Sequence, residues 1–298
     1  MNPRELGFLL LTSHLGNPER KVMTVAQLRR LATRIRSMEK PEGDQPVREE
    51  DLIAIGYSRE ESGRILSLLS DEEILSWYLM QAARKDCVPI TRVSQGYPEK
   101  LRKTLGIDCP GCLWAKGDMS LLSRPAVALV GSRDLREENL AFAVKAGKQA
   151  AKQGYVLVSG NARGADRAAQ DACLNGGGQV ICVVADRLEA QSLTENVLYL
   201  SEDSFDSAFS AQRALSRNRV IHCLGNCVLV AQATLGKGGT WDGVTKNLRH
   251  GWSNVFCFND KTSAAQELLQ MGAHPLKTEE LEHLDTLTQQ DPNFFITE

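Results

Sequence analysis

The sequence predicts an α/β protein with an open, mostly parallel sheet, preceded by a small all-α N-terminal domain. The first observation is a change of texture at Pro125, after which short apolar runs without strict alternation recur between helical patterns. Such runs are typical of strands that are buried on both faces of a parallel sheet. The second observation is that residues 1–85 show helix-type spacing of apolar residues and no clear strand.

The N-terminal 85 residues contain a loop and a helical hairpin. The stretch SMEKPEGDQP, residues 37–46, is expected to be a loop between helices. The stretch DLIAIGYSREESGRILSLLS, residues 51–70, resembles a helix-hairpin-helix unit with Gly56 at its turn. Such a unit either holds a DNA backbone through its turn amides or serves as a packing module. Residues 86–123 are dense in proline and glycine and are expected to form an ordered connector.

Strands and helices alternate over residues 124–276, the predicted α/β domain. The expected strands are AVALVGS, YVLVSG, QVICVVA, CVLVAQA and NVFCFN. The expected helices are EENLAFAVKAGKQAAKQ, ADRAAQDACLN, DSAFSAQRALSRNRVIHCLG, TWDGVTKNLRHG and SAAQELLQMG. This order implies right-handed crossovers, and ligands of such sheets bind at the carboxyl ends of the strands.

Arg163 is expected beside the N-terminus of a helix, because VSGNARGADRAAQ reads as a strand end, a glycine turn and a helix start. A helix N-terminus has unpaired N–H groups and a partial positive charge, so a cation is unfavourable there unless an anion lies between them. Phosphate is the usual anion at such a place. The alternative is that Arg163 extends into solvent or pairs with Asp166 or Asp134.

Three glycine-containing loops follow strand ends and are expected to share one edge of the sheet. Since glycine has no Cβ, a phosphate can approach the backbone amides closely there. Arg217-Asn218-Arg219 is a fourth candidate, within or at the start of the helix before the fourth strand. The three loops are Gly131-Ser132-Arg133, Ser159-Gly160-Asn161-Ala162-Arg163-Gly164 and Gly236-Lys237-Gly238-Gly239-Thr240.

Familiar nucleotide motifs are absent from these loops. No G-x-G-x-x-G follows the first strand, and GKGGT lacks the spacing of a P-loop. An NAD or ATP enzyme is therefore disfavoured, and no cofactor is expected.

Charge and composition restrict the class of protein. Lys and Arg outnumber Asp and Glu by 18 to 17 over residues 1–119 and by 16 to 14 over residues 120–276. Residues 277–298 carry one Lys against six acidic residues and are expected to form an acidic tail. A nearly neutral body binds a polyanion only through a local basic cluster. No stretch is long and apolar enough to cross a membrane, and eight irregularly spaced cysteines indicate reduced thiols in the cytoplasm.

Six stretches together resemble the DNA-processing protein A family (DprA, also called Smf). They are VALVGSR, SGNARGAD, the three glycines before QVICVV, SRNRVI followed by CVLVAQA, QGYPEKL, and CLWAKGD, which occur in family order over residues 92–275. The resemblance implies a Rossmann-like domain that binds single-stranded DNA without being an enzyme. It also implies a homodimer that protects single strands and helps to load a RecA-type recombinase in DNA uptake and recombination.

The resemblance also implies a DNA pocket, although the sequence departs from the family pattern at several positions. GKGGTWDG replaces the usual serine-glycine-serine segment, Asn161 and Ala165 replace bulkier apolar residues, and the C-terminal winged-helix module of many members is not expected here. Cys109 and Cys112 have zinc-knuckle spacing, but no metal site is expected, since the similar family stretch needs none. The implied pocket residues are Gly131, Ser132, Arg133, Ser159, Gly160, Arg163, Gly164, Asp166, Arg217, Asn218 and Arg219, with Lys237, Gly238, Gly239 and Thr240 added from the loop analysis.

Two other functions would use a site at the same edge of the sheet. GKGGTWDG faintly resembles the loop of lysine-decarboxylase-like nucleoside monophosphate hydrolases, whose catalytic carboxylate would correspond to Gly243. A nucleotide-binding sensor would use the same pocket for a free nucleotide. Trp241 and Trp252 are candidates either for base stacking or for packing at the core.

Overall fold

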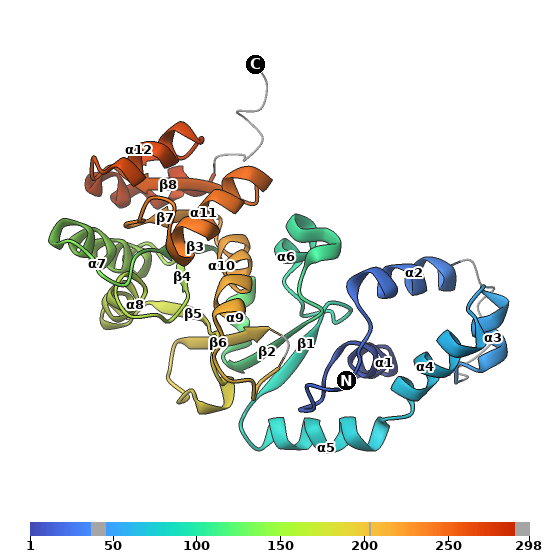
Figure 1. Ribbon diagram of the computed structural model, residues 1–298. Helices are drawn as coiled ribbons and strands as arrows, with labels where there is room; N and C mark the ends of the chain where they lie inside the picture. The colour runs from blue at the N-terminus through green and yellow to red at the C-terminus, as the bar shows by residue number, and fades with distance from the viewer. Residues whose placement is uncertain (37–45, 203, 290–298) are drawn as a thin grey trace.

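The computed structural model describes residues 1–36, 46–202 and 204–289. Figure 1 shows a larger α/β body that contains the sheet and a smaller body of N-terminal helices. The expected loop at residues 37–46 lies outside the described residues except for Pro46. The N-terminal helices are α1 (Pro3–Thr12), α2 (Val25–Arg36), α3 (Glu49–Ala54), α4 (Arg59–Leu69) and α5 (Glu72–Ala83).

The hairpin of α3 and α4 turns at Gly56, whose φ of 88° suits glycine. The amide of Gly56 donates to Ile53 O at 2.9 Å, and the amide of Tyr57 donates to Leu52 O at 3.0 Å. Both turn amides are therefore already engaged within the hairpin. Together with a small apolar core in which Leu52 and Tyr57 are buried, this favours the packing-module interpretation.

One nine-stranded sheet forms the centre of the α/β body, in the order β1-β2-β6-β5-β4-β3-β7-β8-β9. The strands from β6 to β9 in this order are parallel, whereas β1 and β2 join the β6 edge in antiparallel fashion. The predicted open, mostly parallel sheet is therefore confirmed. The strands are β1 (Val88–Thr91), β2 (Cys112–Gly117), β3 (Ala126–Val130), β4 (Val156–Ser159), β5 (Gln179–Val183), β6 (Val197–Glu202), β7 (Cys227–Val230), β8 (Asn254–Phe258) and β9 (His274–Leu276).

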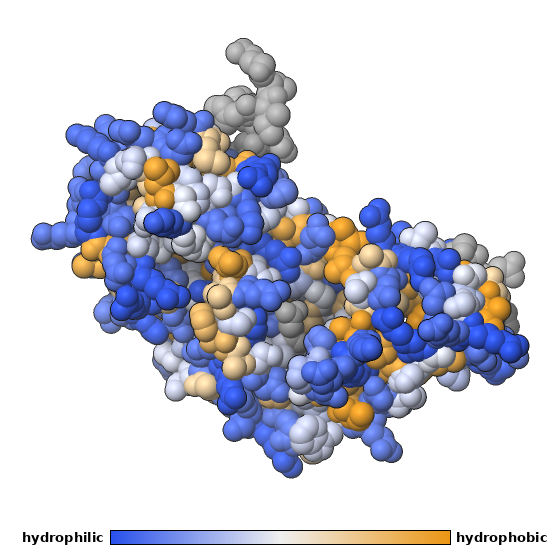
Figure 2. Space-filling model, in the orientation of Figure 1, coloured by the Kyte–Doolittle hydropathy of each residue, from blue (hydrophilic) through white to orange (hydrophobic). Residues whose placement is uncertain are grey.

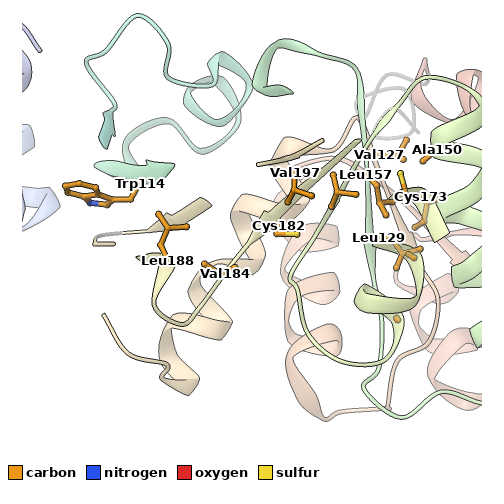
Figure 3. Close-up of a cluster of buried hydrophobic side chains, with 14 of the residues drawn as sticks. Trp114, Val127, Leu129, Ala150, Leu157, Cys173, Cys182, Val184, Leu188 and Val197 are labelled. Atoms are coloured by element: carbon orange, nitrogen blue, oxygen red, sulfur yellow. The ribbon is translucent and has the colours of Figure 1, made fainter. Parts of the chain in front are cut away.

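Helices cover both faces of the sheet, so the central strands are buried throughout. On one face, α7 and α8 pack against Val127, Leu129 and Leu157, and Figure 3 shows these side chains beside Cys173 of α8. On the other face, α6, α10, α11 and α12 contribute to a second core. The helices are α6 (Glu99–Leu105), α7 (Glu137–Lys152), α8 (Ala165–Asn175), α9 (Ala211–Ser216), α10 (Asn218–Leu224), α11 (Gly238–His250) and α12 (Ser263–Gln270).

Residues 86–123 differ from the expected connector, because they supply β1, α6 and β2 to the α/β body. Leu113, Trp114 and Ala115 of β2 are fully buried, so this segment is part of the core. The N-terminal helices are not wholly separate either. Tyr78 of α5 packs on Trp114 with their ring centroids 5.6 Å apart.

The described part of residues 277–298 also differs from the expected acidic tail. A 3₁₀ helix, η4 (Thr278–His283), and α13 (Leu284–Thr288) follow β9. Leu281, Leu284 and Leu287 recur at helical spacing and are buried in the same core as α7. The Leu284 amide donates to Gln153 Oε1, and Gln153 Nε2 donates to Leu281 O, both at 2.8 Å. The folded body therefore extends to residue 288.

Candidate nucleic-acid interface

A pocket of about 920 Å³ lies at the carboxyl ends of the parallel strands, beside the ends of β3 and α11. We call it the strand-edge pocket. It contains most of the residues that the sequence places at this edge, although they come from distant parts of the chain. The predicted residues that line it are Gly131, Ser132, Arg133, Asp166, Arg217, Asn218, Lys237, Gly238, Gly239 and Thr240.

The first two loops of the pocket are held together by close backbone packing. Gly164 has a φ of 84°, and a Cβ at this position would lie 2.4 Å from Arg133 O. The Ala165 amide at the start of α8 donates to Ser132 O at 3.2 Å. A Cβ on Gly131 would lie 2.4 Å from the Ala165 Cβ. These glycines therefore fix the loop geometry, and this packing holds the Arg133 backbone at the pocket.

Asp166 occupies the floor of the pocket and shapes the loop before α8. Its buried carboxylate accepts hydrogen bonds from the amides of Gly160 at 3.1 Å and Ala162 at 3.2 Å. Burial raises the pKa of Asp166 to about 6, while the charge of Arg217 acts in the opposite direction. The anion that neutralises this loop is thus a carboxylate of the chain itself.

Arg217 is buried between α9 and α10 and serves the loop rather than solvent. Its Nη1 atom donates to Gly160 O and to Val183 O. Burial lowers the pKa of Arg217, which measures the cost of keeping this cation away from water. Ser159 is likewise fully buried, and its Oγ receives a hydrogen bond from Gln170. Arg217 therefore positions the backbone of Gly160, and Ser159 connects the end of β4 to α8.

Two predicted arginines lie outside the strand-edge pocket and are paired with carboxylates. Arg163 Nη2 lies 3.1 Å from Asp134 Oδ1, with 74% and 86% of the two side chains exposed. Arg219 Nη2 lies 2.9 Å from Oε2 of the buried Glu202. The anion that faces Arg163 at the start of α8 is the Asp134 carboxylate, which the sequence offered as an alternative to phosphate.

Arg133 and Lys237 are the predicted cations that remain available in the pocket. Both side chains are exposed, and neither has a hydrogen-bond or ion-pair partner among residues 1–36, 46–202 and 204–289. Lys237 immediately precedes α11, whose first turn contains no acidic residue. The first amides of a helix have no partner within the helix, so positive charge and free donors adjoin the same space.

The loop before α11 is tied to its neighbours at two points. Thr240 Oγ1 donates to Gly131 O at 2.9 Å, and Asn218 Nδ2 donates to Gly239 O at 2.9 Å. These bonds join α11 to the end of β3 and to α10. Arg133, Lys237 and the first residues of α11 line the same pocket, an arrangement suited to an anion.

Sequence reasoning missed apolar residues of the pocket. Phe209 and Leu215 line it although 57% and 43% of their surfaces are exposed. The signal available in the sequence was the position of both residues close to the Arg217 motif. His222 also lines the pocket, but burial lowers its pKa to about 4, and its Nδ1 lies 3.0 Å from Asn247 Nδ2. His222 is therefore a neutral, internally bonded side chain.

The family model of DNA recombination-mediator protein A matches residues 89–286. The chain belongs to this family. The resemblance to the DprA/Smf family is thus confirmed, and the match includes β1, β2 and η4, which the expected α/β domain at 124–276 left out.

Relatives within the DprA/Smf family cover part of the chain. DNA processing protein DprA of Streptococcus pneumoniae is 33% identical over 141 residues, which are 44% of this chain and 50% of that protein. Protein Smf of Escherichia coli is 30% identical over 196 residues, 61% of this chain and 51% of that protein. The chain therefore spans about half the length of the curated relatives that it matches.

Solved DprA structures share the fold. The X-ray structure of DprA from S. pneumoniae has a TM-score of 0.69 at 24% identity and covers 95% of this chain and 96% of that chain. A DprA structure from Helicobacter pylori has a TM-score of 0.56 at 24% identity and covers 67% of this chain and 95% of that chain. That H. pylori protein has a single-stranded DNA binding mode described as unique. These likenesses confirm the predicted Rossmann-like architecture.

Proposed function

We propose that the chain binds single-stranded DNA and that the strand-edge pocket receives a backbone phosphate. The observation that carries this proposal is the presence of two exposed, unpaired cations, Arg133 and Lys237, beside the N-terminus of α11. A charge-assisted contact to phosphate is stronger than a neutral hydrogen bond. Family membership supports the choice of DNA over another polyanion.

The other predicted site residues receive distinct roles in this proposal. Asp166, Arg217, Ser159, Gly160 and Gly164 position the loops, since their side chains or backbones are buried and engaged with one another. Ser132, Asn218 and Gly238–Thr240 form the polar walls of the pocket. Arg163 and Arg219 contribute positive charge at the border of the pocket, where ion pairs with carboxylates offset part of that charge.

We propose a biological role in DNA uptake and recombination, as a homodimer that protects single strands and helps to load a RecA-type recombinase. Membership in the recombination-mediator family supports this role. A cytoplasmic location agrees with eight buried cysteines, none of which forms a disulfide. Within the described residues no helix is long and apolar enough to span a membrane.

The experiment is a fluorescence-anisotropy titration of the purified chain with a labelled oligothymidine, duplex DNA and thymidine monophosphate. We expect Arg133→Ala and Lys237→Ala each to weaken oligothymidine binding by about 1–2 kcal/mol, the value of a partly exposed charged contact. If about two to four phosphates are contacted, the log–log salt slope should be roughly −1.5 to −3. Unchanged affinity in both variants, with native circular dichroism, would refute the pocket.

Binding of a free nucleotide is the second candidate. A pocket of about 920 Å³ has the size of a small-molecule site, which favours this candidate as well. The mononucleotide arm of the titration separates the two. Binding of thymidine monophosphate as tight as that of the oligothymidine would favour a nucleotide sensor.

The hypothesis of a nucleoside monophosphate hydrolase lacks a carboxylate at the required position. Gly243 occupies the corresponding position, next to Asn218 and the neutral His222. The carboxylates that line the pocket are Asp166, which accepts from two amides, and Asp242, which pairs with Lys246 at 2.9 Å. We therefore propose a binding protein, and incubation with nucleoside monophosphates should release no free base.

A further inference from the structure

Helix α5 carries apolar side chains that the described part of the chain leaves uncovered. Ile74, Trp77 and Met80 follow one another at intervals of three residues, and 49%, 57% and 45% of their surfaces are exposed. The opposite side of the helix packs into the core through Leu75 and Tyr78. Helix α5 is therefore apolar on two sides, and the described fold covers one of them.

The uncovered side of α5 is accessible from outside the molecule. In Figure 1, α5 lies along the lower border of the N-terminal helices. Figure 2 shows hydrophobic side chains, in orange, between hydrophilic ones on the surface of this body. The described residues that line the strand-edge pocket include none from α5, so a molecule bound to α5 leaves that pocket open.

An acidic and a basic side chain lie at the two ends of this apolar surface. Since helical residues are about 100° apart around the axis, Glu73 and Arg84 project within about 40° of Trp77. Both are exposed, and neither forms an ion pair within residues 1–36, 46–202 and 204–289. We call the following residues the α5 stripe: Glu73, Ile74, Trp77, Met80 and Arg84.

The helix dipole explains only part of this arrangement. It favours an acidic residue near the N-terminus of α5 and a basic residue near the C-terminus, as observed. The dipole does not account for the exposed tryptophan between them. A surface that combines an apolar centre with unpaired charges of opposite sign at its ends is suited to a partner of the same pattern in reverse order.

The α5 stripe is complementary to itself when two copies of the helix lie antiparallel. Glu73 precedes Trp77 by four residues, and Arg84 follows Met80 by four residues, so both pairs are centred on the same point of α5. In a two-fold pair about this point, Glu73 of one copy faces Arg84 of the other, and Trp77 faces Met80. A thioether beside an aromatic ring is a favourable contact. One register therefore satisfies both the charges and the apolar side chains.

We propose that two copies of the chain associate through the α5 stripe with their helices antiparallel. This inference rests on the homodimer of the proposed function and deepens it, because it assigns a contact surface outside the strand-edge pocket. A helix of this length spans only about 18 Å, so the contact is smaller than the standard interface of about 800 Å² per partner. The association is therefore expected to be weak and dependent on concentration.

The test is analytical ultracentrifugation of the purified chain from about 1 to about 300 µM, a range suited to weak association. The variants are Glu73→Lys, Arg84→Glu, an equimolar mixture of these two, and the chain that carries both substitutions. Glu72→Lys is the matched control, because Glu72 is also exposed on α5 and projects about 100° away from Glu73. Circular dichroism verifies that each variant is folded.

We expect the mass of the wild type to rise from one chain towards two as the concentration increases. Glu73→Lys and Arg84→Glu should each weaken the association about tenfold or more, since like charges then face each other at two symmetric positions. The equimolar mixture and the doubly substituted chain should restore it, because opposite charges face each other again. Trp77→Ala should weaken the association, and Glu72→Lys should behave like the wild type.

The outcomes separate this inference from the proposed function. A wild type that remains a single chain up to about 300 µM would overturn both the pairing and the proposed homodimer. Association that Glu73→Lys and Arg84→Glu leave unchanged would keep the homodimer and overturn the role of α5. Weakening in both variants without recovery in their mixture would overturn the antiparallel register. Arg133→Ala should associate like the wild type, so a failure of DNA binding is read independently of the pairing.

Discussion

Asp166 links the stability of the strand-edge pocket to pH. Burial raises the pKa of its carboxyl group from an ordinary 3.8 to about 6. Because the folded state holds the proton more tightly, protonation stabilises the fold. This contribution is complete below about pH 4 and is lost as pH rises through about 6. A difference of about two pKa units corresponds to about 3 kcal/mol, of which about 2 kcal/mol falls between pH 4 and pH 7.

The perturbation is Asp166→Asn, which keeps an oxygen that can accept from the Gly160 or Ala162 amide and removes the ionisation. Urea unfolding followed by circular dichroism gives the free energy of unfolding at each pH. We expect the difference between variant and wild type to rise by about 2 kcal/mol in favour of the variant from pH 4 to pH 7. Asp171→Asn, on the exposed side of the same helix, is the control and should show no such trend.

A constant difference between Asp166→Asn and the wild type across this pH range would refute the reasoning. It would mean that the charge of Arg217 and the two amide donors fully compensate the burial of the carboxylate. A trend of opposite sign would mean that they overcompensate it, as in an ordinary buried ion pair.

Three further predictions concern single side chains. Arg163→Ala should weaken oligothymidine binding by less than about 0.5 kcal/mol, since exposed ion pairs contribute little, and a loss equal to that of Arg133→Ala would contradict the assignment of Arg163 to the border. Gly164→Ala should lower the free energy of unfolding by about 2 kcal/mol or more, because Gly164 has a positive φ and an added Cβ would lie 2.4 Å from Arg133 O. Urea unfolding tests this, with Gly63→Ala as the control, because a Cβ added at Gly63 meets no atom within 4 Å. Leu284→Ala should cost about 2–4 kcal/mol in the same assay, whereas a cost below about 0.5 kcal/mol would restore the view of residues 277–289 as a loose tail.

The sequence predicts well those elements whose pattern is local. Strands β3, β4, β5, β7 and β8 are apolar runs buried on both faces, and their short length and continuous apolar pattern distinguish them from the flanking helices. Strand β6 was missed because polar side chains at Tyr199, Ser201 and Glu202 interrupt its apolar pattern. Strands β1 and β2 were missed because proline and glycine around them indicate a loop. The strand character of β2 depends on pairing with β6, which is far away in the sequence, and β1 pairs in turn with β2.

The convergence of glycine loops at one edge followed from the topology of a parallel sheet, and so the location of the candidate site could be predicted. The availability of each cation could not. Arg163 and Arg219 form ion pairs with carboxylates that lie 29 and 17 residues away in the sequence, and no sequence motif indicates these pairs. Arg133 and Lys237 form no ion pair with a carboxylate of the described residues. Charge counts along the chain cannot distinguish these two cases.

The buried Arg217 shows why a shared motif does not by itself make a side chain a ligand. If its guanidinium turned away to meet a phosphate, Nη1 would leave Gly160 O and Val183 O, whereas a contact through Nη2 alone would not require this. An unsatisfied buried acceptor costs about 1–3 kcal/mol, so the release of two would consume most of the gain from one charged contact. Exposed Arg133 and Lys237 carry no such penalty. A phosphate therefore binds at lower cost to these two, while Arg217 acts through the backbone that it holds in place.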